Sequence, residues 1–376
     1  MSDTKRISIP PIFHKLDKGL PTLPRGYLLD GGPIPEDVVR TMHDACDYYF
    51  HKQESLDGSE WKELQSRFHA DFVEVLKKKD VAQTSEWLLN LHSQNLLRGI
   101  DQFGTERQKI EQSDQEQVNR SLSYRDLLVR LAEAVGALNV EIVSYTGESV
   151  NIYMNVDEIV ERIQDRVGID ISPPKIGAGR FGLQLKNGAV FTNRDIYAIY
   201  LAWRIWNCVD HNPDARVCEI GGGMGRLGYF CRKFGIRHYT FFDLPQIALV
   251  QFYFNSRALD EKVHLHTPDT PAGYDGVRVF PSWHFGDDPT RYDLIVNTDS
   301  MPEMGAPIAD AYINRFESKT RRFLSANQES RKIDSQGNAH AIVHEIARQK
   351  PFLRLLSRHP FWVRNYYVEE LYEVVP

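Results

Sequence analysis

The sequence predicts a mainly helical first half and an α/β second half built on a mostly parallel sheet. Between Pro35 and about Leu97, apolar residues recur every three or four positions, as on the buried face of helices. From about residue 190 onward, short apolar stretches alternate with helical patterns, which is typical of parallel strands covered by helices on both faces. The last 24 residues contain two strand patterns joined by a short connection, so these strands should pair antiparallel. The predicted strands are 215–220, 237–242, 276–281, 292–297 and 322–327, and the predicted helices between them are 224–234, 245–259 and 307–321.

A stretch rich in proline and glycine separates the two halves. Residues 171–195, ISPPKIGAGRFGLQLKNGAVFTNRD, cannot form a helix and are expected to be a structured loop or hairpin. Thr192 followed by Asp195 has the spacing of a capping box, which predicts a helix directly after it. We therefore expect a helical domain over 1–190 and a second domain over 191–376. Residues 105–120 carry so few apolar side chains that they should form a solvated helix or a connector.

Composition narrows the class of protein. A chain of 376 residues is too long to fold around a single hydrophobic core of ordinary size. Its 45 basic and 51 acidic residues give a net charge of −6. This balance, without a long basic run, predicts no nucleic-acid partner. No stretch of about 18 apolar residues exists to cross a membrane, and the four cysteines show no spacing typical of disulfides or zinc. We expect a soluble, cytoplasmic protein.

The stretch VCEIGGGMGRLGYF, residues 217–230, has the layout of a strand, a glycine-rich turn and a helix. From Gly223 onward it satisfies G-x-G-x-x-G, and Asp243 lies about 20 residues further on, as in dinucleotide-binding folds. The same stretch contains E-x-G-x-G-x-G, which begins at Glu219. A carboxylate at that point would repel a pyrophosphate but attract the ammonium group of a methionine moiety. This favours the second pattern.

The E-x-G-x-G-x-G pattern and the segment YTFFDLP, residues 239–245, resemble two motifs of class I methyltransferases that use S-adenosylmethionine (SAM). The resemblance implies a Rossmann-like, seven-stranded methyltransferase sheet with a terminal antiparallel strand pair, and SAM as the cofactor. It implies that Asp243 takes both ribose hydroxyls. Trp283 is placed to lie against adenine, although it could equally pack in the core, and Ser282 could contact the adenine edge. The predicted cofactor-binding residues are Glu219, Gly221, Gly223, Gly225, Asp243, Leu244, Ser282, Trp283 and Asn297.

Three further segments resemble the sugar O-methyltransferase family, whose members are associated with natural-product and polysaccharide sugars. They are YDLIVNTDSMPEM (292–304), FLSANQES (323–330) and the C-terminal HPFWVRNYYVEELYEVV. The likeness covers roughly 175–376 and, more faintly, the helical half. It implies a small-molecule sugar or glycoside as the acceptor and a first half that helps to enclose it. Association into homo-oligomers is compatible with this interpretation.

Methyl transfer to a sugar hydroxyl needs a base or a metal ion, because an alcohol is barely acidic. Glu303 and Asp299 follow the strand 292–297, and His344 follows the strand 322–327, so we expect them to face the transferred methyl. Glu303 and His344 should converge on the acceptor hydroxyl, with Asp299 as an alternative base. Gln328 and Glu329 are the predicted hydrogen-bond partners of the sugar. His340 and His344 could form a metal pair, and acidic residues such as Asp287 could hold Mg²⁺, but no metal site is predicted.

Other functions stay open at this point. The enzyme could methylate a phenol or a carboxylate, for which a flat apolar slot would be expected instead of several polar groups. It could be a non-catalytic partner protein with a SAM-binding fold, although the intact glycine motif with Asp243 argues against this. An NAD(P)-dependent oxidoreductase is the remaining alternative.

Overall fold

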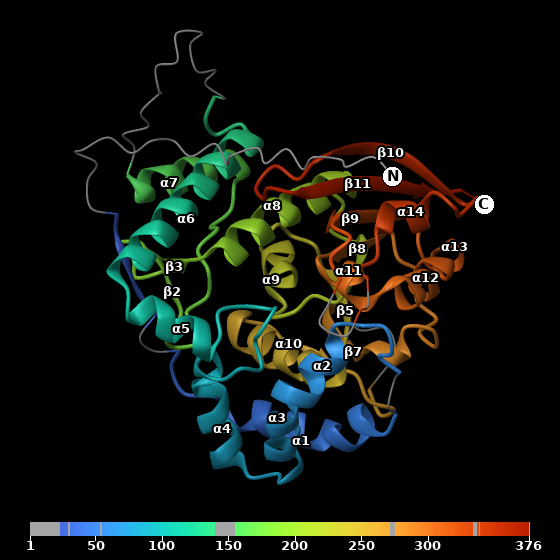
Figure 1. The fold of residues 1–376 in the computed structure, drawn as a ribbon, viewed down its shortest axis with the longest axis horizontal. Coiled ribbons are helices and arrows are strands. Elements are labelled where there is room, and N and C mark those ends of the chain that lie inside the picture. Colours follow the sequence, from blue (N-terminus) through green and yellow to red (C-terminus); the bar gives the residue numbers. More distant parts are fainter. Residues whose placement is uncertain are drawn as a thin grey trace.

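The computed structural model describes residues 23–28, 31–52, 55–139, 155–270, 275–333, 337 and 339–375. Its centre is an eight-stranded sheet with the order β10-β11-β9-β8-β4-β5-β7-β6 (Figure 1). The strands β4 to β9 are parallel wherever they pair, whereas β11 is antiparallel to both β9 and β10. The strands are β4 (Arg216–Ile220), β5 (His238–Asp243), β6 (His264–Leu265), β7 (Gly276–Pro281), β8 (Leu294–Thr298), β9 (Arg322–Gln328), β10 (Leu353–Pro360) and β11 (Tyr367–Val374).

This sheet confirms the predicted fold class, including the terminal antiparallel pair, and adds one strand. The extra strand is β6, which pairs with β7 at the edge of the sheet. Two residues are too few to show the alternation by which a strand is recognised in a sequence. The seven expected strands therefore become eight.

Helices cover both faces of the sheet. Successive residues of a strand point to opposite faces, and Val217 accordingly belongs to one hydrophobic cluster while Cys218 and Ile220 belong to another. The predicted helix 307–321 is found as two shorter helices, α12 and α13, which are separated at Arg315. A further short helix, α11, comes before them and ends at Gly305, whose φ is 78°. The helices of this half are α8 (Asn193–Cys208), α9 (Arg226–Lys233), α10 (Pro245–Ala258), α11 (Ser300–Met304), α12 (Ala306–Asn314), α13 (Phe316–Lys319) and α14 (Val343–Ala347).

The first half is mainly helical, as its periodicity indicates. Of the two interpretations of residues 105–120, the helix is the one found, because α5 and α6 cover most of this segment. None of the helices in the described part of the chain is both long and apolar enough to span a membrane. The helices are α1 (Glu36–Phe50), α2 (Trp61–Leu64), α3 (Ala70–Lys77), α4 (Val81–Leu89), α5 (Gly104–Glu111), α6 (Asp114–Val135) and α7 (Val156–Val167).

The connection between the halves is the predicted hairpin. Within it, β2 (Phe181–Gln184) pairs antiparallel with β3 (Val190–Phe191), and β1 (Arg25–Tyr27) joins β2 on its other side. Thr192 and Asp195 form the predicted capping box at the start of α8. The larger hydrophobic cluster takes buried residues from both sides of residue 190, such as Val39 and Ile199. In Figure 1 α1 lies below α10, which it contacts, so the first half packs directly on the layer that covers the sheet.

Candidate cofactor and active site

A cavity of about 490 Å³ lies at the carboxyl ends of β4, β5, β7 and β8. Open α/β sheets bind their ligands at this edge, because loops from several strands meet there. Of the predicted cofactor-binding residues, seven line the cavity. These are Glu219, Gly221, Gly223, Asp243, Leu244, Ser282 and Trp283.

The glycine turn after β4 needs backbone angles that other residues rarely adopt. Gly221 and Gly223 have φ values of 71° and 58°. A Cβ atom on Gly221 would lie 2.1 Å from Ser300 Oγ, so no larger residue fits between β4 and α11. Gly225, with a φ of 82°, is the N-cap of α9 and does not line the cavity. Gly225 therefore has a role in the turn, and its predicted contact with the cofactor stays a prediction.

Glu219, the penultimate residue of β4, places a buried carboxyl group in the cavity wall. Its side chain accepts a hydrogen bond of 2.9 Å from Tyr239 Oη and forms no ion pair with any described residue. Burial raises the pKa of Glu219 to about 8, with Asp243 acting in the same direction and Tyr239 against it. A cationic group in the cavity would favour the ionised form of this carboxyl.

Asp243 ends β5 and ties the strand to the glycine turn. Its Oδ2 accepts hydrogen bonds from the backbone N–H of Gly223 at 3.1 Å and from Gln251 Nε2 at 2.7 Å. Its Oδ1 accepts a bond of 2.8 Å from the backbone N–H of Leu244. These donors hold the carboxylate in one orientation in the cavity wall.

Trp283 lies in the turn after β7, where it contacts residues of α1 and the segment after it and also lines the cavity. Its indole Nε1 donates a 3.3 Å hydrogen bond to the backbone oxygen of Tyr49, and the ring of His51 packs edge-on with centroids 4.6 Å apart. Trp283 is therefore held by neighbouring residues of the first half and also lines the cavity, and its contact with adenine stays a prediction.

Asn297 is placed differently from the prediction. Its side chain is fully buried and does not line the cavity. Asn297 Nδ2 donates to the backbone oxygen of Ile220 at 2.9 Å and to Ser300 Oγ at 2.6 Å. Asn297 therefore joins β8 to the start of the glycine turn, and its predicted contact with the cofactor stays a prediction.

Asp299 and Glu303 both line the cavity but have opposite electrostatic environments. Asp299, with a φ of 69°, accepts hydrogen bonds from Arg194 at 3.1 Å and also from Arg364 and Tyr367. Burial alone would raise the pKa of Asp299, but the guanidinium groups of Arg364 and Arg194 hold it below its usual value. A carboxylate stabilised in this way is a poor proton acceptor.

Glu303 in α11 is the better candidate for a base. Its carboxyl group forms no hydrogen bond or ion pair with any residue in the described ranges. Burial raises the pKa of Glu303 to about 8, helped by Asp299 and Glu60 and only partly opposed by Arg194 and Lys332. A base with a pKa near the working pH combines availability with proton affinity.

The structure does not bring His344 to Glu303. His344 Nδ1 lies 2.7 Å from Glu370 Oε1, because α14 turns this side chain toward β11. Glu329 is ion-paired with Arg358, and Gln328 Nε2 lies 3.3 Å from His340 Nδ1. His344, Gln328 and Glu329 do not line the cavity. Among the predicted acceptor-side residues, only Glu303 and Asp299 do.

Several cavity residues come from the first half and carry no recognisable motif. The loop before α2, together with Trp61 at the start of that helix, lies on α11. The backbone N–H of Glu60 and the Oγ of Ser59 both donate to the backbone oxygen of Glu303, at 3.0 and 3.1 Å. This segment adds Ser55, Asp57, Ser59 and Trp61 to the lining, and a second segment adds Gly99 and Ile100. Arg194 and Arg364 of the second half were also missed, because nothing local marks them as cavity residues.

No metal centre is evident in the part of the chain that the structure describes. It contains no group of three or more His, Cys, Asp or Glu side chains that could hold a metal ion. His340, proposed as a metal partner of His344, instead contacts Glu60 through its Nε2 at 2.8 Å. All four cysteines are buried and free.

Comparison with known proteins finds likeness only among solved structures. No family model and no curated protein matches the sequence. Magnesium protoporphyrin IX methyltransferase (ChlM) from Synechocystis PCC 6803, solved with bound SAM, is 14% identical with a TM-score of 0.36, over 49% of this chain and 82% of that chain. A ribosomal protein L11 methylase from Lactobacillus delbrueckii subsp. bulgaricus is 11% identical with a TM-score of 0.32, over 48% and 79%. A point variant of MtNAS in complex with SAM is 11% identical with a TM-score of 0.34, over 91% and 98%.

These likenesses are too distant to carry an argument about activity, so the fold rests on the topology of the sheet itself. A glycine turn after a central strand, parallel strands on both sides of it and an antiparallel strand next to β9 are all present. The second half has the Rossmann-like fold of class I SAM-dependent methyltransferases.

Proposed function

We propose that this protein is a SAM-dependent methyltransferase. The observation that carries the proposal is the meeting of Glu219, the glycine turn and Asp243 in one cavity at the carboxyl edge of the sheet. Their spacing along the chain matched a motif, but only the cavity makes them neighbours around a volume that can take a cofactor. SAM, when bound, supplies a methyl group on a positively charged sulfur.

In this proposal, each of the cavity residues predicted from the sequence would face one part of SAM. Glu219 would face the ammonium group of the methionine portion, and Gly221 and Gly223 would let that portion approach the backbone. Asp243 would accept hydrogen bonds from the ribose hydroxyls. Trp283 would lie against adenine. The ionised form of Glu219, which a cationic ligand favours, would repel a pyrophosphate.

We further propose that the acceptor is a hydroxyl group of a sugar, in a free sugar or a glycoside. The resemblance of the sequence to sugar O-methyltransferases motivates this choice. It is supported by the polar side chains of Ser55, Asp57, Ser59 and Arg194 in the cavity wall, because a sugar needs several hydrogen-bond partners. A phenol would be better served by a flat apolar slot.

Glu303 is the proposed general base. It would take the proton of the acceptor hydroxyl, so that the oxygen could accept the methyl group that bound SAM would supply. Asp299 would stay ionised and hold Arg194 and Arg364 in place around the acceptor. The protein would thus supply orientation and proton removal.

Two calorimetric titrations test the proposal, one with S-adenosylhomocysteine (SAH) and one with NAD(P). We expect SAH to bind and NAD(P) not to bind, and the reverse result would reject the methyltransferase assignment. A mass-spectrometric screen with SAM would then compare glycosides with their matched aglycones and simple phenols. A gain of one methyl on glycosides alone supports the sugar hydroxyl, and methylation of the aglycones refutes it.

A further inference from the structure

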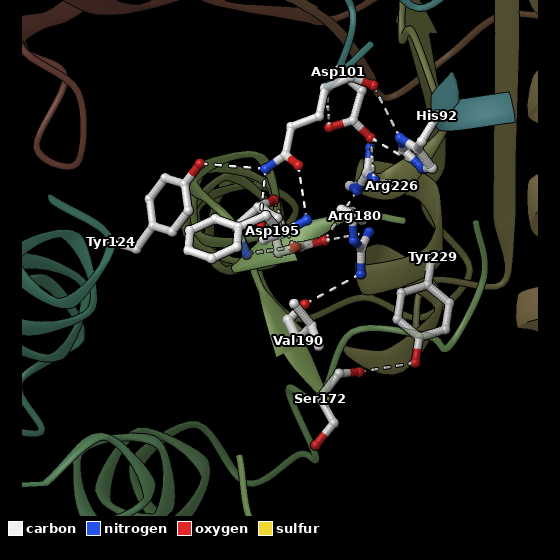
Figure 2. Close-up of polar contacts among 12 residues, drawn as sticks. His92, Asp101, Tyr124, Ser172, Arg180, Val190, Asp195, Arg226 and Tyr229 are labelled. Carbon is white, nitrogen blue, oxygen red and sulfur yellow. Dashed lines mark hydrogen bonds and ion pairs between the residues drawn. The ribbon is translucent and has the colours of Figure 1, made fainter. Parts of the chain in front are cut away.

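A buried network of charged side chains joins the first half of the chain to the start of α9 (Figure 2). Arg226, the first residue of α9, lies between two carboxylates. Its Nη2 is 2.5 Å from Asp101 Oδ2, and its Nε is 3.0 Å from Asp195 Oδ1. Arg180 Nη1 lies 3.6 Å from the same oxygen of Asp195, and His92 Nε2 lies 3.9 Å from Asp101 Oδ2. All five side chains are buried.

The network is balanced in charge, with two carboxylates and two guanidinium groups. Burial alone would raise the pKa of Asp101, but Arg226, His92 and Arg180 together hold it well below its usual value. Burial lowers the pKa of His92 to about 4, so this ring is neutral at neutral pH. Removing one member of such a buried set leaves another charge without its partner.

The segment that Asp101 anchors forms a wall of the cavity. Gly99 and Ile100, directly before it, line the cavity together with Arg226. Ile100 Cγ2 lies 2.9 Å from the position that a Cβ atom on Gly223 would take, so Ile100 packs directly over the glycine turn. The backbone oxygen of Gly99 accepts a 3.1 Å hydrogen bond from Arg194 Nη2. Two arginines of the second half thus hold this short segment from both ends.

We infer that Asp101 is a positioning residue for cofactor binding: its pairing with Arg226 seats Ile100 over Gly223 and completes the cofactor cavity. The first half therefore builds part of the cofactor site in addition to covering the acceptor. An apolar wall at this point excludes water, which strengthens the attraction between Glu219 and a cationic ligand. The inference rests on the proposed function, because it takes the cofactor to be SAM.

The test uses the full-length protein and measures SAH affinity by calorimetry and the midpoint of thermal unfolding for the same variants. Asp101→Asn removes the charge and keeps the shape of the side chain, and Ile100→Ala removes the wall while leaving the ion pair. Each has a matched control. Glu369→Gln weakens the ion pair between the buried Glu369 and the partly exposed Arg204, neither of which lines the cavity. Ile163→Ala truncates a fully buried isoleucine of α7 that also lies outside the cavity lining.

We expect Asp101→Asn and Ile100→Ala each to weaken SAH binding by about tenfold, as is usual for coupling through a shared packed element. The two controls should stay within about twofold of the unmodified protein, because they are independent of the site, although all four variants lower the unfolding midpoint. Equal SAH affinity in test and control variants would overturn the inference. If Asp101→Asn does not fold, Ile100→Ala decides alone. Absence of SAH binding to the unmodified protein would instead reject the proposed function.

Discussion

Replacing Glu303 by glutamine is the most direct test of the proposed chemistry. The change keeps the shape of the side chain and removes its ability to take a proton. Because the Glu303 carboxyl makes no hydrogen bond or ion pair within the described part of the chain, the substitution breaks no side-chain contact there. A positioned base typically contributes about 10²–10⁴-fold to the rate. We expect turnover to fall on that scale while SAH affinity stays nearly unchanged.

The pH dependence gives this test a second, independent readout. The ionised form of Glu303 is the base, and its pKa in the fold is about 8. Turnover should therefore rise with pH up to about 8 and then level off, and this rise should be absent in Glu303→Gln.

The stability of the fold should fall with rising pH over the range in which turnover rises. The pKa of Glu303 is higher in the folded chain than its ordinary value of 4.5. Its contribution to the free energy of unfolding is therefore full below that ordinary value and is lost as the pH rises through about 8. Above this range the Glu303→Gln variant should unfold at a higher temperature than the unmodified protein, and well below it the two should unfold alike.

The assay measures methyl transfer by mass spectrometry, with the acceptor that the screen identifies and saturating SAM. Two variants serve as controls. Glu329→Gln removes a carboxylate that pairs with Arg358 outside the cavity lining, and His344→Ala removes a ring that contacts Glu370. Both should turn over nearly normally. Near-normal turnover of Glu303→Gln with an unchanged pH profile would refute the assignment, and loss of activity on adding EDTA, restored by Mg²⁺, would then indicate a metal-activated alcohol.

Three further predictions concern the walls of the same cavity. Asp243→Ala should weaken SAH binding by about 1.5–3 kcal/mol, the range of charge-assisted hydrogen bonds, which calorimetry can measure. Gly223→Val should abolish SAH binding, since its Cβ would meet Ile100, and should cost about 1–2 kcal/mol of stability because the backbone is left-handed. Its control is Gly168→Val, which shares the positive φ but has no atom within 4 Å of the new Cβ. Asp299→Asn should move the rise of turnover to lower pH, because it removes a negative charge that raises the pKa of Glu303. An unmoved profile would contradict this.

Features set by neighbouring residues in the sequence could be predicted. The strands of the sheet follow from runs of apolar residues, and the capping box of Thr192 and Asp195 from a spacing of three. The division of the predicted helix 307–321 into α12 and α13 was missed, because the break falls at Arg315, and arginine is an ordinary helix-forming residue. Periodicity reports which side of a segment is apolar, but it does not report where the helical hydrogen bonds are interrupted.

In the candidate site, too, the positions set by local sequence could be predicted, whereas those set by distant contacts could not. Asp243 and Glu303 follow strands, and the carboxyl ends of parallel strands meet at one edge, so their approach could be expected. His344 lies on a short helix further from β9, and helical spacing does not say which neighbour a side chain will meet. Its contact with Glu370 depends on where β11 pairs, which is a feature of the whole sheet. The contacts of Ile100 and Asp101 join segments over 100 residues apart, and no local pattern encodes them.

The pair Asp299 and Glu303 shows how one short segment can supply two different functions. Both carboxyl groups line the cavity, and burial disfavours the ionised form of each. Because Asp299 is bonded to two arginines, its pKa is lowered, whereas the pKa of Glu303, which has no such partner, is raised to about 8. Pairs of acids whose surroundings separate their pKa values in this way commonly divide into one permanent anion and one proton carrier. Asp299 is also linked to the part of the cavity proposed to hold the cofactor, because Arg194 donates hydrogen bonds both to Asp299 and to the backbone oxygen of Gly99. Asp299 thus connects the position of the base with the wall that covers the glycine turn, so the two ends of the cavity should not behave independently.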